Sequence, residues 1–238
     1  MKWTVLLFIM VCATPAWGQG LLVTATEPAS GAASVSLERT VSFTFSAPLD
    51  TTARFSQDGT LPVEFFAISP PDSVRIDSTY FSDDLTQLFF DVEHTAETDF
   101  VWILTGAYDQ AGGMLCQPTV LSYTTADERG PYSVSGQIQL VIAVKRSGSE
   151  CLSGGFFTTL WYALPEAGGH IVAAALAVRS EGSGIIPFTI EGVREGTYWL
   201  GPYETSMGIT QPTTESFYFY DAELAGMPDP LVVADSNR

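Results

Sequence analysis

Few residues in this sequence have the type and spacing that catalysis requires. The chain has two histidines, His94 and His170, and neither belongs to a zinc-protease motif or a nucleophile elbow. His94 ends a predicted strand and His170 follows two glycines, so we interpret both as solvated loop residues rather than general bases. Acidic pairs such as Asp91 and Glu93 resemble a glycosidase pair, but 27 carboxylates make such pairs common by chance. We therefore predict no catalytic residues and no enzyme.

One acidic segment near the C-terminus has the spacing of a metal-binding loop. Asp221, Glu223 and Asp229 occupy positions 1, 3 and 9 around a turn glycine, which is loosely similar to a calcium loop. Ala225 and Val232 occupy positions 5 and 12, where such a loop supplies oxygen ligands. We expect a plain acidic loop and no cofactor, with bound Ca²⁺ as the alternative.

Aromatic residues form the best candidate binding surface. In the segment FYFY at 217–220, alternation along a strand sends Tyr218 and Tyr220 to one face. The same alternation turns Trp199 outward if Tyr198 faces the core, and Trp161 outward if its neighbours 160 and 162 face inward. Such rings stack on sugars or dock on proteins, so the partner would be a glycan or a protein. The favoured alternative is that they pack against the neighbouring domain or under a loop.

The first eighteen residues are typical of a signal peptide. Lys2 precedes the apolar run WTVLLFIMV, and Ala16 and Gly18 place small residues before Gln19, which predicts cleavage at that point. The protein should thus be exported to the periplasm, the cell surface or the medium. Lipidation of Cys12 is a minor alternative. No run of apolar residues is long enough for a transmembrane helix.

The remaining cysteines and the charge fit an exported protein. Cys116 and Cys151 are left after processing, and they either form a disulfide between the two halves or stay as separate thiols. The chain has 27 acidic against 10 basic residues, a net charge of −17. Because such a chain has no basic surface to neutralise phosphate, we exclude nucleic acid as a partner.

Nearly every periodic segment of the sequence predicts a β-strand. Apolar and hydroxyl residues alternate in 41–46, and Leu88, Phe90 and Val92 alternate in 87–93. The Ala-rich segment 169–179 fits a helix or a buried strand, and the strand is favoured. The other predicted strands are 61–68, 100–104, 120–124, 132–144, 156–164, 171–178, 185–190, 197–203, 217–220 and 231–233. A charged stretch with Gly-Pro at 127–131 predicts a linker, hinged near residues 130–131, between domains at 19–126 and 132–238.

The first half carries four motifs in order: TEPASGA at 26–32, VSFTFSAPLD at 41–50, TDFVWIL at 98–104 and DQAGG at 109–113. Together they resemble bacterial Ig-like domains of the S-layer-protein type, over about residues 21–126. Phe100 stands where that family usually has tyrosine. The resemblance implies an Ig-like β-sandwich.

The second half carries VSGQI at 134–138 and FTIEGVREGTY at 188–198. These resemble the transthyretin-like sandwich of carboxypeptidase regulatory-like domains, over about residues 132–235. Phe188 and Ile190 should point inward, Gly192 and Gly196 should permit the turn, and Tyr198 should return to the core.

Both resemblances imply structural, adhesive or spacer modules. We therefore expect an all-β protein with two consecutive sandwiches, Ig-like and then a seven-stranded transthyretin-like one. Its expected function is that of an exported non-catalytic structural or interaction module. The alternative is a carbohydrate-binding module that uses the outward aromatic residues of the second domain.

Overall fold

The computed structural model describes residues 20–53, 61–139, 155–161, 168–177, 185–205 and 230–234. Within these ranges every regular element is a β-strand except a short 3-10 helix, η1, at Pro71–Ser73. This confirms the all-β prediction. In the same ranges no helix has the length and apolar character needed to cross a membrane. The predicted signal peptide, residues 1–18, lies outside the described residues.

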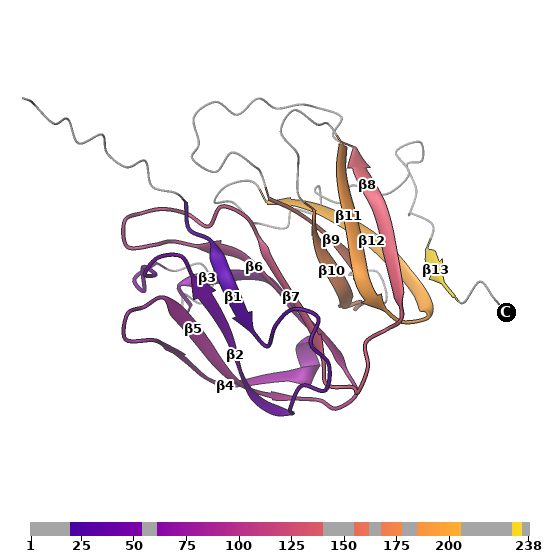
Figure 1. Cartoon of the computed structure of the whole chain (residues 1–238), viewed down its shortest axis with the longest axis horizontal. Helices are drawn as coiled ribbons and strands as arrows, with labels where there is room; N and C mark the ends of the chain where they lie inside the picture. Colours follow the sequence, from indigo (N-terminus) through magenta and orange to yellow (C-terminus); the bar gives the residue numbers. More distant parts are fainter. Residues whose placement is uncertain are drawn as a thin grey trace, which may run out of the picture.

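The strands form two groups, which we call the first sandwich (β1–β7) and the second sandwich (β8–β13; Figure 1). The first comprises β1 (Val23–Glu27), β2 (Glu38–Phe45), β3 (Val63–Ser69), β4 (Val74–Phe81), β5 (Gln87–His94), β6 (Asp99–Ala107) and β7 (Thr119–Thr124). The second comprises β8 (Tyr132–Gln139), β9 (Gly155–Trp161), β10 (Ile171–Ala177), β11 (Ile185–Val193), β12 (Gly196–Thr205) and β13 (Leu231–Val233).

The first sandwich packs a sheet of order β1-β2-β5-β4 on a sheet of order β3-β6-β7. The alternation predicted for β2 and β5 is confirmed, because Val41, Phe43, Leu88 and Phe90 are fully buried between the sheets. Aromatic rings dominate this core: the Phe90 and Trp102 ring centroids lie 5.3 Å apart. Such contacts add to the free energy of apolar burial.

Two strands of the first sandwich were not predicted from the sequence. β1 and β4 are the edges of their sheet. β4 is exposed along six of its eight residues, and Ile76 and Tyr80 are 39% and 44% exposed. An edge strand that is solvated on most positions has no reason to alternate apolar and polar residues, which explains why its sequence shows no strand periodicity.

Strand β6 is buried on both faces of its sheet. Phe100, Trp102 and Leu104 enter the core of the first sandwich, whereas Val101 and Ile103 enter a separate cluster with Ile171 and Ala174 of β10. A strand covered on both sides is expected to be a continuous apolar run, and FVWIL at 100–104 is such a run. The outer face of the β3-β6-β7 sheet is therefore the surface on which the second sandwich lies (Figure 1).

The second sandwich packs the β8-β11 pair on a sheet of order β10-β9-β12-β13. Phe188, Ile190 and Tyr198 are buried as predicted. Gly192 has φ +75°, a conformation that glycine adopts without strain. Gly196 was predicted to permit the backbone angles of the turn, but what it provides is space for the Tyr198 ring. A Cβ at position 196 would lie 2.7 Å from the Tyr198 hydroxyl. The Ala-rich segment is the strand β10, as favoured over a helix.

Candidate functional site

His94 is a buried residue of the first sandwich, not the solvated loop residue that its position suggested. Its side chain is 5% exposed, with Nδ1 3.2 Å from the Leu37 carbonyl and Nε2 2.7 Å from the Tyr123 hydroxyl. Trp102 Nε1 donates to the same hydroxyl at 2.9 Å. The prediction was wrong because His94 ends β5 with its side chain between the two sheets, where its polar atoms have partners.

The hydrogen bonds around His94 fit its neutral form. Nδ1–H donates to Leu37, and Nε2 accepts from Tyr123, whose oxygen accepts from Trp102. Burial lowers the pKa of His94 against a smaller raising effect of the Leu37 carbonyl, and burial raises the pKa of Tyr123. These shifts keep both side chains uncharged near neutral pH. The triad of His94, Tyr123 and Trp102 therefore satisfies its own hydrogen bonds inside the first sandwich.

Lowering the pH below about 6.5, the ordinary histidine pKa, is expected to reduce the free energy of unfolding. The folded pKa of His94 is lowered, so the unfolded chain binds more protons, and the loss continues until the pH reaches the folded value. Denaturant titrations at about pH 7.5 and about pH 5.5 measure this loss in the free energy of unfolding. Burial also lowers the pKa of His170, so His170→Gln is the matched control for His94→Gln. If the free energy of unfolding of His94→Gln falls with pH as steeply as that of the wild type, His94 is not the source of the pH effect.

Asp91 lies on the outer face of the β1-β2-β5-β4 sheet. Its carboxylate accepts hydrogen bonds from the hydroxyls of Thr40 (2.8 Å), Ser78 (2.6 Å) and Tyr80 (3.3 Å). These bonds, that of Ser78 first, lower the pKa of Asp91. Asp91 is therefore a stable anion on an open surface. This is the opposite of the raised pKa that a glycosidase acid needs.

The apolar part of the joint between the sandwiches is formed by β3, β6 and β7 on one side and β10 on the other. Val101 and Ile103 are fully buried against Ile171 and Ala174. At the margin of this cluster, the Ser69 hydroxyl donates to the Ile171 carbonyl at 2.7 Å. A buried hydrogen bond of this kind fixes the relative position of the two strands, because losing it leaves polar atoms unpaired.

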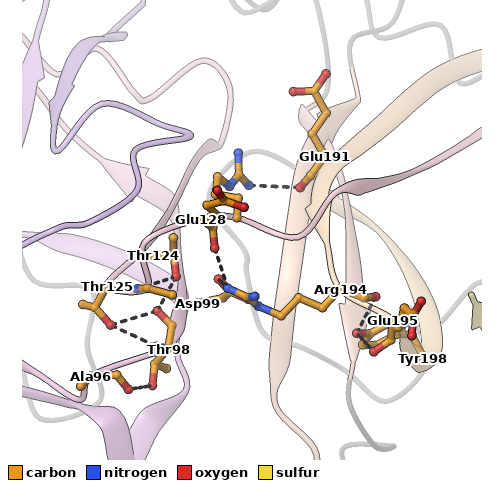
Figure 2. Close-up of polar contacts among 12 residues, drawn as sticks. Ala96, Thr98, Asp99, Thr124, Thr125, Glu128, Glu191, Arg194, Glu195 and Tyr198 are labelled. Carbon is orange, nitrogen blue, oxygen red and sulfur yellow. Dashed lines mark hydrogen bonds and ion pairs between the residues drawn. The ribbon is translucent and has the colours of Figure 1, made fainter. Parts of the chain in front are cut away.

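The polar part of the joint consists of two arginines at the linker. Arg194, in the β11–β12 turn, donates from Nε and Nη2 to both carboxylate oxygens of Asp99 at 2.8 and 3.2 Å. Nη2 also donates to the Glu128 carbonyl at 2.9 Å (Figure 2). Arg129 donates to the Glu191 carbonyl at 3.1 Å. Because a forked guanidinium fixes both distance and orientation, these contacts hold the turn against the first sandwich.

The linker is closely packed at Gly130, and the hinge expected near residues 130–131 stays a prediction. Gly130 lies so close to the backbone of Val193 and Arg194 that a Cβ would overlap them. Gly192 approaches the Arg129 guanidinium in the same way. At Gly130 the close atoms belong to the backbone and require glycine, whereas at Gly192 they belong to a flexible side chain and the positive φ is what favours glycine.

Replacing Arg194 by alanine is expected to lower the free energy of unfolding by about 0.5–1 kcal/mol, because the pair with Asp99 is partly exposed. The difference between variant and wild type should shrink as salt is added. Arg75, whose side chain is 69% exposed on β4, offers the matched control Arg75→Ala. Denaturant titration at low and high salt tests this. Equal effects of the two substitutions would show that the Asp99 contact adds nothing beyond a surface pair.

The structure describes only part of the predicted aromatic surface. Trp161 and Trp199 are directly paired between β9 and β12, and Trp161 pairs in turn with Ile171 of β10. Register therefore places Trp199, half-buried, on the sheet face that β10 turns toward the first sandwich. Tyr218 and Tyr220 lie outside the described residues, so the predicted surface stays a prediction.

The predicted calcium loop, with Asp221, Glu223 and Asp229, also lies outside the described residues. Within the described ranges, no group of three or more acidic, histidine or cysteine side chains is arranged to hold a metal ion. The prediction for this loop stays open to test.

Cys116 is disulfide-bonded, and Cys151 lies outside the described residues. We expect Cys116 to pair with Cys151, because Cys12 falls in the predicted signal peptide. Peptide mapping of the exported protein without reductant should recover a cross-linked pair that separates on reduction. Recovery of either residue as an alkylated free thiol would contradict the pairing.

No family model matches the chain, and no curated protein matches it by sequence. Among solved structures, a crystal structure of the S-layer protein rSbsC is similar with a TM-score of 0.31 and 11% identity, over 78% of this chain and 32% of that one. A structure of the surface layer protein SbsC, domains 1–6, gives a TM-score of 0.32 and 10% identity, over 80% and 34%. This chain thus spans about a third of either protein. Both TM-scores are too low to support an argument about function.

Proposed function

We propose that this chain is an exported, non-catalytic structural or interaction module of the cell envelope or surface, in which two sandwiches act as one rigid unit. The observation that carries the proposal is the joint. It combines the buried cluster around Ile103 and Ile171, the Arg194–Asp99 pair and the packed linker at Gly130. A module that spans a distance or presents a partner at a fixed angle needs such a joint.

The polar groups of the first sandwich support a structural task. His94 and Tyr123 bond each other between the sheets. Asp109 accepts from the backbone N–H groups of Ala111 and Gly113 at 2.9 and 2.7 Å and so closes its turn. Each of these groups has partners that the fold itself requires, and we propose that none takes part in a reaction and that no cofactor is needed.

The finer assignment is part of the proposal. We propose an Ig-like domain of the S-layer-protein type followed by a transthyretin-like domain, on the motifs at 26–50 and 188–198. The buried positions of Phe188, Ile190 and Tyr198 support the second assignment. The partner would be a protein or a glycan at the cell surface.

Three measurements on the exported protein test this function. Cell fractionation should find it outside the cytoplasm, small-angle scattering should give one compact particle, and assays with ester and glycoside substrates should give no turnover. Turnover that disappears when a carboxylate pair such as Asp91 and Glu93 is replaced would overturn the proposal. So would scattering curves that require two independently moving bodies.

A further inference from the structure

The outer face of the β1-β2-β5-β4 sheet contains an open hollow of about 400 Å³. It is lined by residues 38–40 of β2, residues 91–93 of β5, and Arg75 and Asp77 of β4. The register between β4 and β5 shifts between Ile76 and Ser78. Such a bulge bends an edge strand and redirects its side chains. The hollow therefore lies where β4 departs from regular pairing.

The lining of this hollow selects a polar ligand. Val92 is the single apolar residue that lines it, beside four carboxylates and two guanidinium groups. Arg75 donates to Asp77 at 2.9 Å and also pairs with Glu93, and Arg39 pairs with Glu27 outside the hollow, so both guanidinium groups already have anionic partners. An apolar ligand would gain little here. An anionic ligand would meet excess negative charge on a chain whose net charge is −17.

An aromatic pair adjoins the hollow along the same face. The Tyr80 and Phe89 rings stack with centroids 5.0 Å apart and planes inclined by 15°. Tyr80 is 44% exposed, and its hydroxyl lies 3.3 Å from Asp91 in the lining. The face thus presents exposed aromatic surface next to closely spaced hydrogen-bond donors and acceptors.

We propose that this face is a saccharide-binding groove that takes an uncharged oligosaccharide. Neighbouring sugar hydroxyls are donors and acceptors at once, and they match a lining in which the carboxylates and the Thr40 hydroxyl oxygen accept and the N–H groups of the Arg75 guanidinium donate. The apolar C–H face of a sugar ring can lie on Tyr80. A neutral ligand carries no charge for the acidic surface to repel. The groove is separate from the aromatic surface predicted around Trp199 in the second sandwich. The proposal does not depend on the structural function proposed above.

Binding of the exported protein to an array of neutral oligosaccharides, followed by calorimetry with the best binder, tests the groove. Asp91→Asn and Tyr80→Ala should each weaken binding at least tenfold. Asp84→Asn is the matched control, because the Asp84 pKa is also lowered by hydroxyl hydrogen bonds, from Ser82 and Thr86, outside the groove. It should leave binding unchanged.

Several results would overturn the groove. These are no saccharide binding by the wild type, equal binding by Tyr80→Ala and the wild type, or loss of binding in Asp84→Asn alone. Binding of a lysine-rich peptide but no sugar would assign the hollow to cationic partners and overturn the saccharide proposal. Small-angle scattering of the same samples reports the rigid two-sandwich unit separately, so failure of one proposal is distinguished from failure of the other.

Discussion

Replacing Tyr123 by phenylalanine is expected to lower the free energy of unfolding by about 2–4 kcal/mol. Among the described residues, the Tyr123 hydroxyl is the hydrogen-bond partner of both His94 Nε2, at 2.7 Å, and Trp102 Nε1, at 2.9 Å. Tyr123 is 1% exposed, so water has little access to replace the lost oxygen. Two buried polar groups would lose their partner while the ring, and therefore the packing, is retained. Equilibrium denaturation of the two proteins measures the difference.

The matched control for this prediction is Tyr80→Phe. It removes a tyrosine hydroxyl of similar chemistry, but from a ring that is 44% exposed, and should change the free energy of unfolding by at most about 0.5 kcal/mol. A double-mutant cycle with His94→Ala would give the coupling between His94 and Tyr123 directly. If Tyr123→Phe is as stable as the wild type, the triad adds no net stability and His94 is held by packing alone.

Placing an aspartate at position 103 is expected to separate the two sandwiches. Ile103 is fully buried in the joint cluster but takes no part in the core of the first sandwich. A carboxylate there would be buried without a partner, at a cost of more than about 3 kcal/mol if the joint stayed closed. The joint should open instead, because each sandwich has its own core. Small-angle scattering should then show a larger radius of gyration, and proteases should cut the linker at 127–131.

Two further variants make this result specific to the joint. Ala174→Asp changes the facing strand β10 at the same cluster and should open the joint in the same way. Ile76→Asp makes the same apolar-to-acid change at a residue that is 39% exposed on β4, and should leave both measurements unchanged. If Ile103→Asp keeps the compact scattering curve and a protected linker, the joint is not held by this cluster.

Much of the fold could be predicted from periodicity. Strands with one buried face, such as β2, β5 and β11, alternate in sequence because their faces differ in environment. The edge strand β4 gave no such signal, since most of its residues face solvent on either side. His94 was misplaced for a related reason: its burial depends on Tyr123 and Trp102, which come from the other sheet.

The contact between the two sandwiches could be predicted only in part, for a different reason. The run FVWIL at 100–104 indicates burial on both faces, and that signal was present in the sequence. The sequence does not say what covers the second face, because the partners Ile171 and Ala174 are far away along the chain. The contacts of Arg129 and Arg194 could not be predicted for the same reason. Their acceptors, the Glu191 and Glu128 carbonyls and the Asp99 carboxylate, belong to other elements.

The doubly buried strand β6 also bears on how this protein can be divided. A fragment ending at the linker would leave Val101 and Ile103, both fully buried in the intact chain, on an open sheet surface. Apolar sheet surfaces of this kind promote self-association. The first sandwich has its own sheets and core, but as a separate fragment it is expected to aggregate. A soluble fragment would need polar residues at these two positions.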